Sequence, residues 1–319
     1  MGEGTALENA PGQAVRGREG DTLVDEGRPS ALVIDALPAD RAAAGGPDVA
    51  NPVRPRPPRQ PTARATVATA RAARPDACVV AEHQFDASTA LAGDTWHGAM
   101  AYAAFTRPVW SWLAENDIDR YWGVPAGHAP YTGAEMARVM DEFNATIPWR
   151  SRVHSLNLLD SHDTPRLLSI AGRDRYAVAV GVLLTMPGIP MVFAGDEIGT
   201  HGVDLEDGRQ PFRWDKGSWD HELLAWHRTL IQLRRTHPAL VSGGFRWLHT
   251  GDDVIVFERS HAEQTLIVQA ARRAHEPLAC TVHATDLLAG HDLAPGDTLP
   301  GSGPSLGVWR VQPAPADRG

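Results

Sequence analysis

The feature that most constrains the fold is a series of short apolar runs that end at acidic residues and alternate with helical segments. The runs cover residues 78–81, 153–159 and 189–194. Helices are predicted between and after them, at residues 107–115, 132–145, 173–186 and 219–236. Strands that alternate with helices predict a parallel sheet with crossover helices. In such sheets the catalytic residues lie at the carboxyl ends of the strands, and in this sequence acidic residues stand at these ends.

The first 76 residues predict little folded structure. Residues 41–64 are crowded with proline, arginine, alanine and glycine, which exclude a helix interior and a central strand. Only residues 31–37 (ALVIDAL) are typical of a strand, and residues 62–74 of a plain helix. We therefore expect residues 1–76 to be a poorly ordered segment, either a truncated remnant of the barrel or a stretch read in a shifted frame.

The part after residue 237 has a different pattern. Residues 238–313 contain short apolar runs separated by glycine, aspartate and proline, which predict a small antiparallel β-sandwich domain. The predicted strands cover residues 245–248, 254–257, 265–268, 278–282 and 307–311. Residues 314–319 are expected to be a tail. The preceding part, residues 77–237, is the predicted catalytic domain.

Composition excludes several classes of protein. The 319 residues are 43% hydrophobic and carry a formal net charge of -9, which disfavours general binding to nucleic acid. No apolar run is long enough for a membrane span, and the amino terminus lacks a signal-peptide core. Two cysteines, Cys78 and Cys280, cannot form a disulfide framework, so we expect a cytoplasmic protein.

Several motifs stand at the predicted strand ends. Residues 79–88 read VVAEHQFDAS, residues 156–166 read LNLLDSHDTPR, and residues 188–199 read GIPMVFAGDEIG. A carboxylate directly after a buried strand can retain its proton for delivery, because apolar surroundings raise its pKa. Residues 206–215 (EDGRQPFRWD) follow the third motif.

Together these segments, over about residues 77–313, resemble the α-amylase family of glycoside hydrolases. The likeness is greatest to its α-glucosidase, neopullulanase and cyclomaltodextrinase-like members. The resemblance implies a partial (β/α)₈ TIM barrel, from about strand four or five to strand eight, followed by the β-domain. It also implies a retaining glycosidase that acts on α-glucosidic linkages of oligosaccharides. No cofactor is expected, and no calcium ligand set is found, although family members often bind calcium.

The resemblance assigns roles to individual residues. Retaining hydrolysis needs a general acid and a carboxylate nucleophile. Glu82 would be the general acid/base, and Asp163 would stabilise the transition state. Further residues would bind the sugar; they are His162, Arg166, Arg209, Trp96 and Trp214.

The nucleophile is expected in a segment of the form G-x-R-x-D at the end of the fourth strand. Asp48, in GGPDVANP, is the candidate, although Gly46 stands where the family has arginine. The family's D-x-x-x-N-H segment of the third strand is absent. Four βα units need on the order of 120 residues, more than the 76 before the first strand motif, so we expect a half barrel. Such a chain would have little activity alone and would associate with itself through its open edges.

Other functions have less support in the sequence. A zinc hydrolase is disfavoured because Ala225 stands where H-E-x-x-H, begun at His221 and Glu222, needs its second histidine. No G-x-S-x-G esterase motif occurs. A sugar-binding remnant without catalysis remains an alternative, as does a transglycosylase or isomerase of the same family. The only partner expected besides a second copy is the oligosaccharide.

Overall fold

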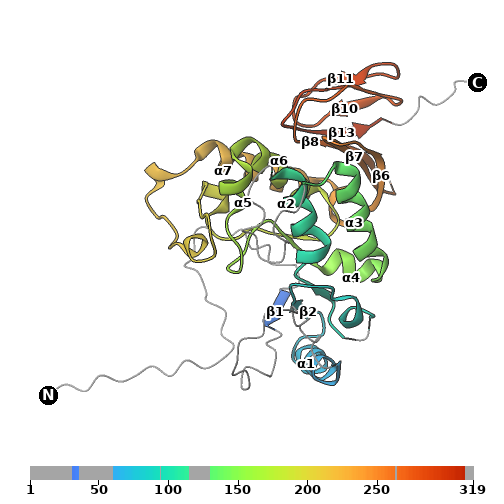
Figure 1. Cartoon of the computed structure of the whole chain (residues 1–319). Helices are drawn as coiled ribbons and strands as arrows, with labels where there is room; N and C mark the ends of the chain where they lie inside the picture. Colours follow the sequence, from blue (N-terminus) through green and yellow to red (C-terminus); the bar gives the residue numbers. More distant parts are fainter. Residues whose placement is uncertain (1–30, 36–59, 94, 115–129, 263, 313–319) are drawn as a thin grey trace, which may run out of the picture.

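The computed structural model describes residues 31–35, 60–93, 95–114, 130–262 and 264–312 (Figure 1). Short parallel strands and their helices form one part, and an antiparallel sheet at the carboxyl-terminal end forms the other. Among the described residues, no helix is both long and apolar enough to cross a membrane.

The parallel strands lie in a row. Strands β1 (Ala31–Asp35), β2 (Cys78–Glu82) and β3 (Gly98–Ala99) pair in that order, and β4 (Leu156–Leu158) pairs with β5 (Ile189–Met191). A parallel bridge between the residue after β3 and the start of β4 connects the two groups. Among the described strands, β1 and β5 each have one neighbour, so the row is open.

The helices of this part surround the row. Their bounds are α1 (Gln60–Ala73), α2 (Arg107–Leu113), α3 (Gly133–Ala145), α4 (Trp149–His154), α5 (Leu167–Ala171), α6 (Arg173–Thr185), α7 (His221–Thr236) and α8 (Pro238–Ser242). A π-helical turn, η2 (Tyr102–Thr106), precedes α2. Short 3₁₀ turns are η1 (Ser88–Ala90), η4 (Asp196–Ile198), η5 (Asp207–Arg209) and η6 (Lys216–Ser218).

Local sequence explains where these elements begin. The hydroxyl of Thr132 accepts the backbone N–H of Glu135, whose carboxylate in turn accepts the backbone N–H of Thr132. This reciprocal capping box fixes the start of α3, as predicted for Thr132. Gly98 is required in β3, because a Cβ there would overlap the backbone of His154. The short β3 can therefore approach the end of α4 closely.

The carboxyl-terminal part forms an antiparallel sheet, as predicted, although it has more strands than expected. Six strands pair in the order β11-β10-β13-β8-β7-β6, and β12 pairs with β9. Their bounds are β6 (Gly244–Thr250), β7 (Val254–His261), β8 (Gln264–Ala271), β9 (Leu278–Ala279), β10 (Ala284–Asp286), β11 (Asp292–Leu293), β12 (Thr298–Leu299) and β13 (Ser305–Val311).

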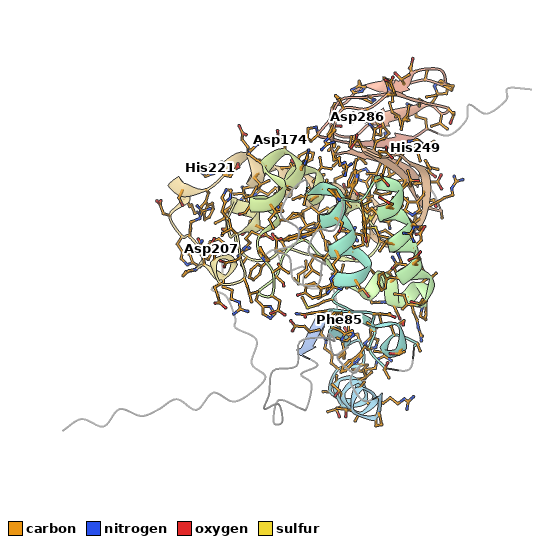
Figure 2. All side chains as sticks on the ribbon, in the orientation of Figure 1. Phe85, Asp174, Asp207, His221, His249 and Asp286 are labelled. Atoms are coloured by element: carbon orange, nitrogen blue, oxygen red, sulfur yellow. The ribbon has the colours of Figure 1, made fainter. Side chains whose placement is uncertain are left out.

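One hydrophobic core joins the helices to this sheet. Apolar side chains of α2, α3 and α6 pack against those of β7 and β8, and side chains fill the space between the two layers (Figure 2). Two arginines, one in β7 and one directly after β8, bond across the same boundary. Arg259, fully buried in β7, donates to the carbonyl of Thr185 at the end of α6, and Arg272 donates to the carbonyl of Trp112 in α2.

Three sequence predictions need correction. The strand predicted at residues 153–159 is shorter, because Val153 and His154 form the end of α4. The run at residues 189–194 forms a strand only to Met191; residues 189–193 are half-buried rather than buried, and Ala194 is exposed. The strand predicted at residues 278–282 ends at Ala279. The strand and helix expected within the first 76 residues are confirmed as β1 and α1.

Candidate active site

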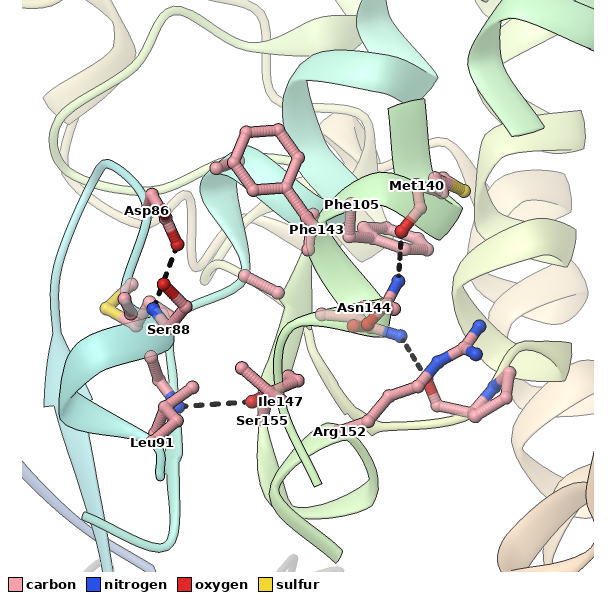
Figure 3. Close-up of a pocket in the computed structure, with 18 of the residues that line it drawn as sticks. Asp86, Ser88, Leu91, Phe105, Met140, Phe143, Asn144, Ile147, Arg152 and Ser155 are labelled. Carbon is pink, nitrogen blue, oxygen red and sulfur yellow. Dashed lines mark hydrogen bonds between the residues drawn. The ribbon is translucent and has the colours of Figure 1, made fainter. Parts of the chain in front are cut away.

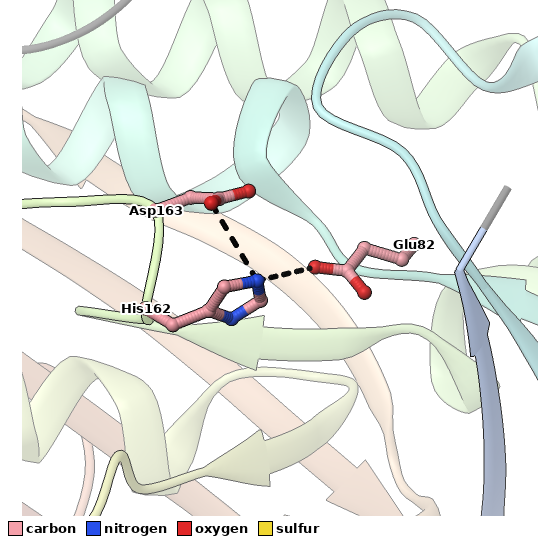
Figure 4. Close-up of side chains that lie close together, drawn as sticks. All are labelled: Glu82, His162 and Asp163. Atoms are coloured by element: carbon pink, nitrogen blue, oxygen red, sulfur yellow. Dashed lines mark ion pairs between the residues drawn. The ribbon is translucent and has the colours of Figure 1, made fainter. Parts of the chain in front are cut away.

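Three side chains from two strand ends meet at one edge of the row (Figure 4). Glu82 is the last residue of β2, and His162 and Asp163 lie in the turn after β4. The Nε2 atom of His162 is 3.3 Å from a carboxylate oxygen of Glu82 and 3.5 Å from one of Asp163. The side chain of Glu82 is 14% exposed and that of His162 is 54% exposed, so a ligand can reach the group from solvent.

Asp163 is held in place from several sides. The side-chain amide of Gln84 donates to its Oδ2 at 2.5 Å, and its own backbone N–H donates to the hydroxyl of Ser161 at 3.0 Å. The guanidinium of Arg209 lies 3.8 Å from its Oδ1 and donates from Nε to the carbonyl of His162 at 2.7 Å. These contacts fix the orientation of the carboxylate, because charged groups form the stronger and more directional hydrogen bonds.

A buried tyrosine supports the same turn. Tyr102 is fully buried, and its hydroxyl donates to Ser161 Oγ at 2.7 Å. Burial raises the pKa of Tyr102, and the nearby carboxylates of Asp163 and Glu82 raise it further. The phenol therefore stays protonated and can serve as a donor to the serine that bonds Asp163.

Behind this turn lies a buried charged network. Arg166 is 1% exposed and bonds Asp196 Oδ1 at 2.5 Å, the carbonyl of Gly208 at 2.9 Å and that of Ala194 at 3.1 Å. Burial raises the pKa of Asp196 to about 6, and burial together with Asp196 raises the pKa of Asp160 well above its usual value. The network joins the turn after β4 to the turn after β5.

The role expected for Arg166 therefore needs a correction. Its guanidinium is enclosed and bonded to protein atoms, so the substrate-binding role expected for it does not fit its position. Trp96 also lies away from the carboxylates. It is 3% exposed and packs in a second apolar cluster with Val79 and Leu91, so its ring offers no face to a sugar at Glu82.

The other expected sugar-binding residues lie differently. Arg209 joins the site through its contacts with His162 and Asp163. Trp214 is 81% exposed and packs beside Phe212, with 4.7 Å between the ring centroids. Asp48, the expected nucleophile, lies outside the described residues.

Two further features of the part that carries the parallel strands could bind a ligand: a set of metal-ligand side chains and a small cavity. Glu82, His162 and Asp163 offer one imidazole nitrogen and two carboxylate oxygens within 4.8 Å of one another, a set that could also hold a divalent cation. A separate cavity lies between the segment after β2, η2 and α3, and Figure 3 shows its largely apolar lining, which includes Phe105 and Met140. At about 50 Å³ it has room for little more than water.

Comparison with known proteins decides the family. The sequence model named "Alpha amylase, catalytic domain" matches residues 57–223, which is more than half of the chain. The chain belongs to the alpha-amylase family. The predicted resemblance is thereby confirmed.

Relatives within the alpha-amylase family carry related names. A cyclomaltodextrinase from a Bacillus species is 30% identical over 200 residues, and neopullulanase 2 of Thermoactinomyces vulgaris is 32% identical over 177 residues. The matched regions cover 61% and 55% of this chain but 33% and 28% of those proteins. The chain thus spans about a third of the length of these curated relatives.

Solved structures with a similar fold include two at 27% and 28% sequence identity. The debranching enzyme of Nostoc punctiforme, in its native form, aligns with a TM-score of 0.63 at 28% identity and covers 77% of this chain and 54% of its own. A structure from Thermus thermophilus aligns with a TM-score of 0.70 at 27% identity, over 80% of this chain and 56% of its own.

The backbone reveals an aspartate that the sequence reasoning missed. In the pairing of β1 with β2, Asp35 stands at the register position of Glu82, at the same end of the neighbouring strand. Against the G-x-R-x-D segment, residues 31–35 keep only the aspartate, with Ala31 in place of the glycine and Val33 in place of the arginine. The predicted strand at residues 31–37 already carried this signal, but both aspartates lack the arginine, with Val33 and Gly46 in its place, so the motif did not single out Asp35.

Proposed function

We propose that this chain carries the acid/base and transition-state-stabilising groups of a retaining glycosidase that acts on α-glucosidic linkages of oligosaccharides. The observation that carries the proposal is the convergence of Glu82, His162 and Asp163 from two separate strand ends. Two carboxylates beside an imidazole, open to solvent on one side, suit the recognition of sugar hydroxyls and of a cationic transition state. The names of the relatives support the choice of substrate.

Each group would have one task. Glu82 would protonate the leaving oxygen and later take a proton from water. Asp163, oriented by Gln84 and Arg209, would bind sugar hydroxyls more strongly as the ring flattens toward the oxocarbenium ion. His162 would donate to the same sugar.

For the nucleophile we propose Asp35 ahead of Asp48. Neighbouring strands lie about 4.8 Å apart, and retaining enzymes keep their two carboxyl groups about 5 Å apart. The register of Asp35 with Glu82 supports that spacing. With Val33 in the arginine position, no guanidinium from that position would keep the nucleophile ionised, so we expect weak turnover at most.

The same register supports a partial barrel. We propose that β1 to β5 correspond to strands four to eight of a (β/α)₈ barrel. The support is their parallel pairing in sequence order and the bridge that connects β3 to β4. Glu82 and Asp163 would then lie at the carboxyl ends of strands five and seven, at the face where barrel enzymes act.

Binding and turnover should be measured separately. Acarbose is titrated calorimetrically into the full chain, and turnover is followed with a nitrophenyl α-glucoside and maltotriose. Replacing Asp163→Asn should weaken acarbose binding about tenfold or more, because a charge-assisted hydrogen bond is lost. Glu222→Gln, an exposed glutamate of α7, is the matched control and should change nothing.

The outcomes separate the alternatives. Weak turnover that Glu82→Gln removes supports the glycosidase. Acarbose binding without turnover supports the sugar-binding remnant, which the loss of the arginine at Val33 favours. Product analysis distinguishes hydrolysis from transglycosylation or isomerisation. Absence of both binding and turnover, or turnover that survives Glu82→Gln, contradicts the proposal.

A further inference from the structure

A second, basic cleft lies at the other end of β2. It has a volume of about 380 Å³, within the range of small-molecule sites, and lies between α1, the start of β2, the segment before β3 and α4. Cys78 begins β2 at this cleft and Glu82 ends the strand at the active site. The two residues are four positions apart in the strand, which corresponds to about 13 Å, so the two sites are distinct.

The cleft carries positive charge in a chain whose net charge is negative. Arg71 and Arg150 line it, both exposed, together with His97 and His154. Within the described part of the chain, neither arginine forms an ion pair; Arg150 donates from Nη2 to the carbonyl of Gly93. Neither guanidinium charge is therefore matched by a carboxylate of the described residues.

The carboxylate of Asp76, which lines the cleft, does not neutralise the positive charge of Arg71 and Arg150. Asp76, the only described carboxylate in its lining, accepts a hydrogen bond from Nε of Arg74 at 2.9 Å. The pKa of Asp76 is lowered by this hydrogen bond, so its charge is already matched by that of Arg74. Among the described residues of the lining, the surplus of charge is therefore positive.

Neutral donors complete the lining. Nδ1 of His97 accepts the backbone N–H of Val79 at 2.8 Å, which places the proton of the neutral ring on Nε2. Burial lowers the pKa of His97, and the nearby Arg71, His154 and Arg150 lower it further. Trp96 is 3% exposed, and its indole N–H has no hydrogen-bond partner among the described residues.

We propose that this cleft binds a small phosphate dianion, either free phosphate or the phosphate group of a sugar monoester. Two guanidinium groups balance a double negative charge and match tetrahedral oxygens, and the imidazole N–H adds a neutral donor. A metal cation would be repelled by the same charges. This site does not depend on the proposed glycosidase function.

Calorimetry on the full chain, at constant ionic strength, tests the proposal directly. Inorganic phosphate and glucose 6-phosphate are the probes, and glucose is the phosphate-free control. Both phosphates should bind saturably, and Arg71→Gln and Arg150→Gln should each weaken binding about tenfold. Arg64→Gln, an exposed arginine of the same helix as Arg71 that does not line the cleft, should leave it unchanged.

The source of the ligand follows from the same titrations. Tighter binding of glucose 6-phosphate than of phosphate indicates a phosphorylated sugar, and equal binding indicates free phosphate. Binding should be the same in Glu82→Gln, which separates this site from the proposed active site. The proposal is overturned if no saturation occurs up to about 10 mM phosphate, a limit that corresponds to a very weak site. It is equally overturned if Arg71→Gln, a change on an exposed helix face, leaves affinity unchanged.

Discussion

At the scale of single residues, burial of Asp160 makes the free energy of unfolding depend on pH. Its Oδ1 accepts the backbone N–H of Leu167 at 2.7 Å, and its other oxygen faces Asp196. Because its pKa is raised in the folded chain, the carboxyl stays protonated there, while the unfolded chain releases the proton above about pH 4. The free energy of unfolding is therefore highest below about pH 4. It falls as the pH rises from there toward the pKa that Asp160 has in the folded chain.

Asp160→Asn should remove this fall in the free energy of unfolding, because an amide does not ionise. The amide reproduces the protonated carboxyl, with an oxygen for Leu167 and an N–H for Asp196. Near pH 4 the variant and the parent should be equally stable, and at pH 7 the variant should be the more stable of the two. Urea unfolding at both pH values measures the difference, with exposed Asp174→Asn as the control. If the free energies of unfolding of variant and parent change equally between the two pH values, Asp160 is not the source of the pH dependence.

At the scale of elements, the short strand β3 depends on one glycine. A Cβ on Gly98 would meet the backbone of His154 and Ser155, which cannot rotate away. Gly98→Ala should therefore lower the free energy of unfolding by about 2 kcal/mol or more, through a forced shift of β3 against α4. Thermal unfolding measures it. Gly217→Ala, whose Cβ would meet only the side chain of Asp215, serves as the control and should cost far less.

Elements with strong local signals were predicted well. Thr132 marked the start of α3 because its capping box is local in sequence, and the acidic strand ends were recognised for the same reason. Val153 and His154 were placed in a strand because an apolar run shows no boundary, whereas the turn at Pro148 begins a helix there. Trp96 and Arg166 were assigned to sugar binding because the sequence carries no measure of burial. The contact between Gln84 and Asp163 joins residues 79 positions apart, which no local pattern reveals.

At the scale of the whole molecule, the open row of parallel strands predicts association. The strand β5 has one described neighbour, β4, and its residues are half-buried, as is the following Val192. Unpaired strand edges with apolar side chains form contacts with other chains. We expect the purified chain to form dimers or larger species, measured by light scattering after size exclusion over a range of concentrations.

A charged edge should oppose this association. Val192→Lys places a charge beside β5 and should shift the population toward monomer, whereas Val203→Lys, on an exposed loop, should not. A chain that stays monomeric at all concentrations would show that the edge is covered within the molecule.

The shared core described above also limits how this chain can be recombined with its relatives. The layer of α2, α3 and α6 obtains its second wall from β7 and β8, and Arg259 and Arg272 bond across the boundary. A crossover between α8 and β6, at the buried Gly243, would separate the two halves of one core. Chimeras that exchange the sheet should therefore fold only when α3 and α6 come from the same parent.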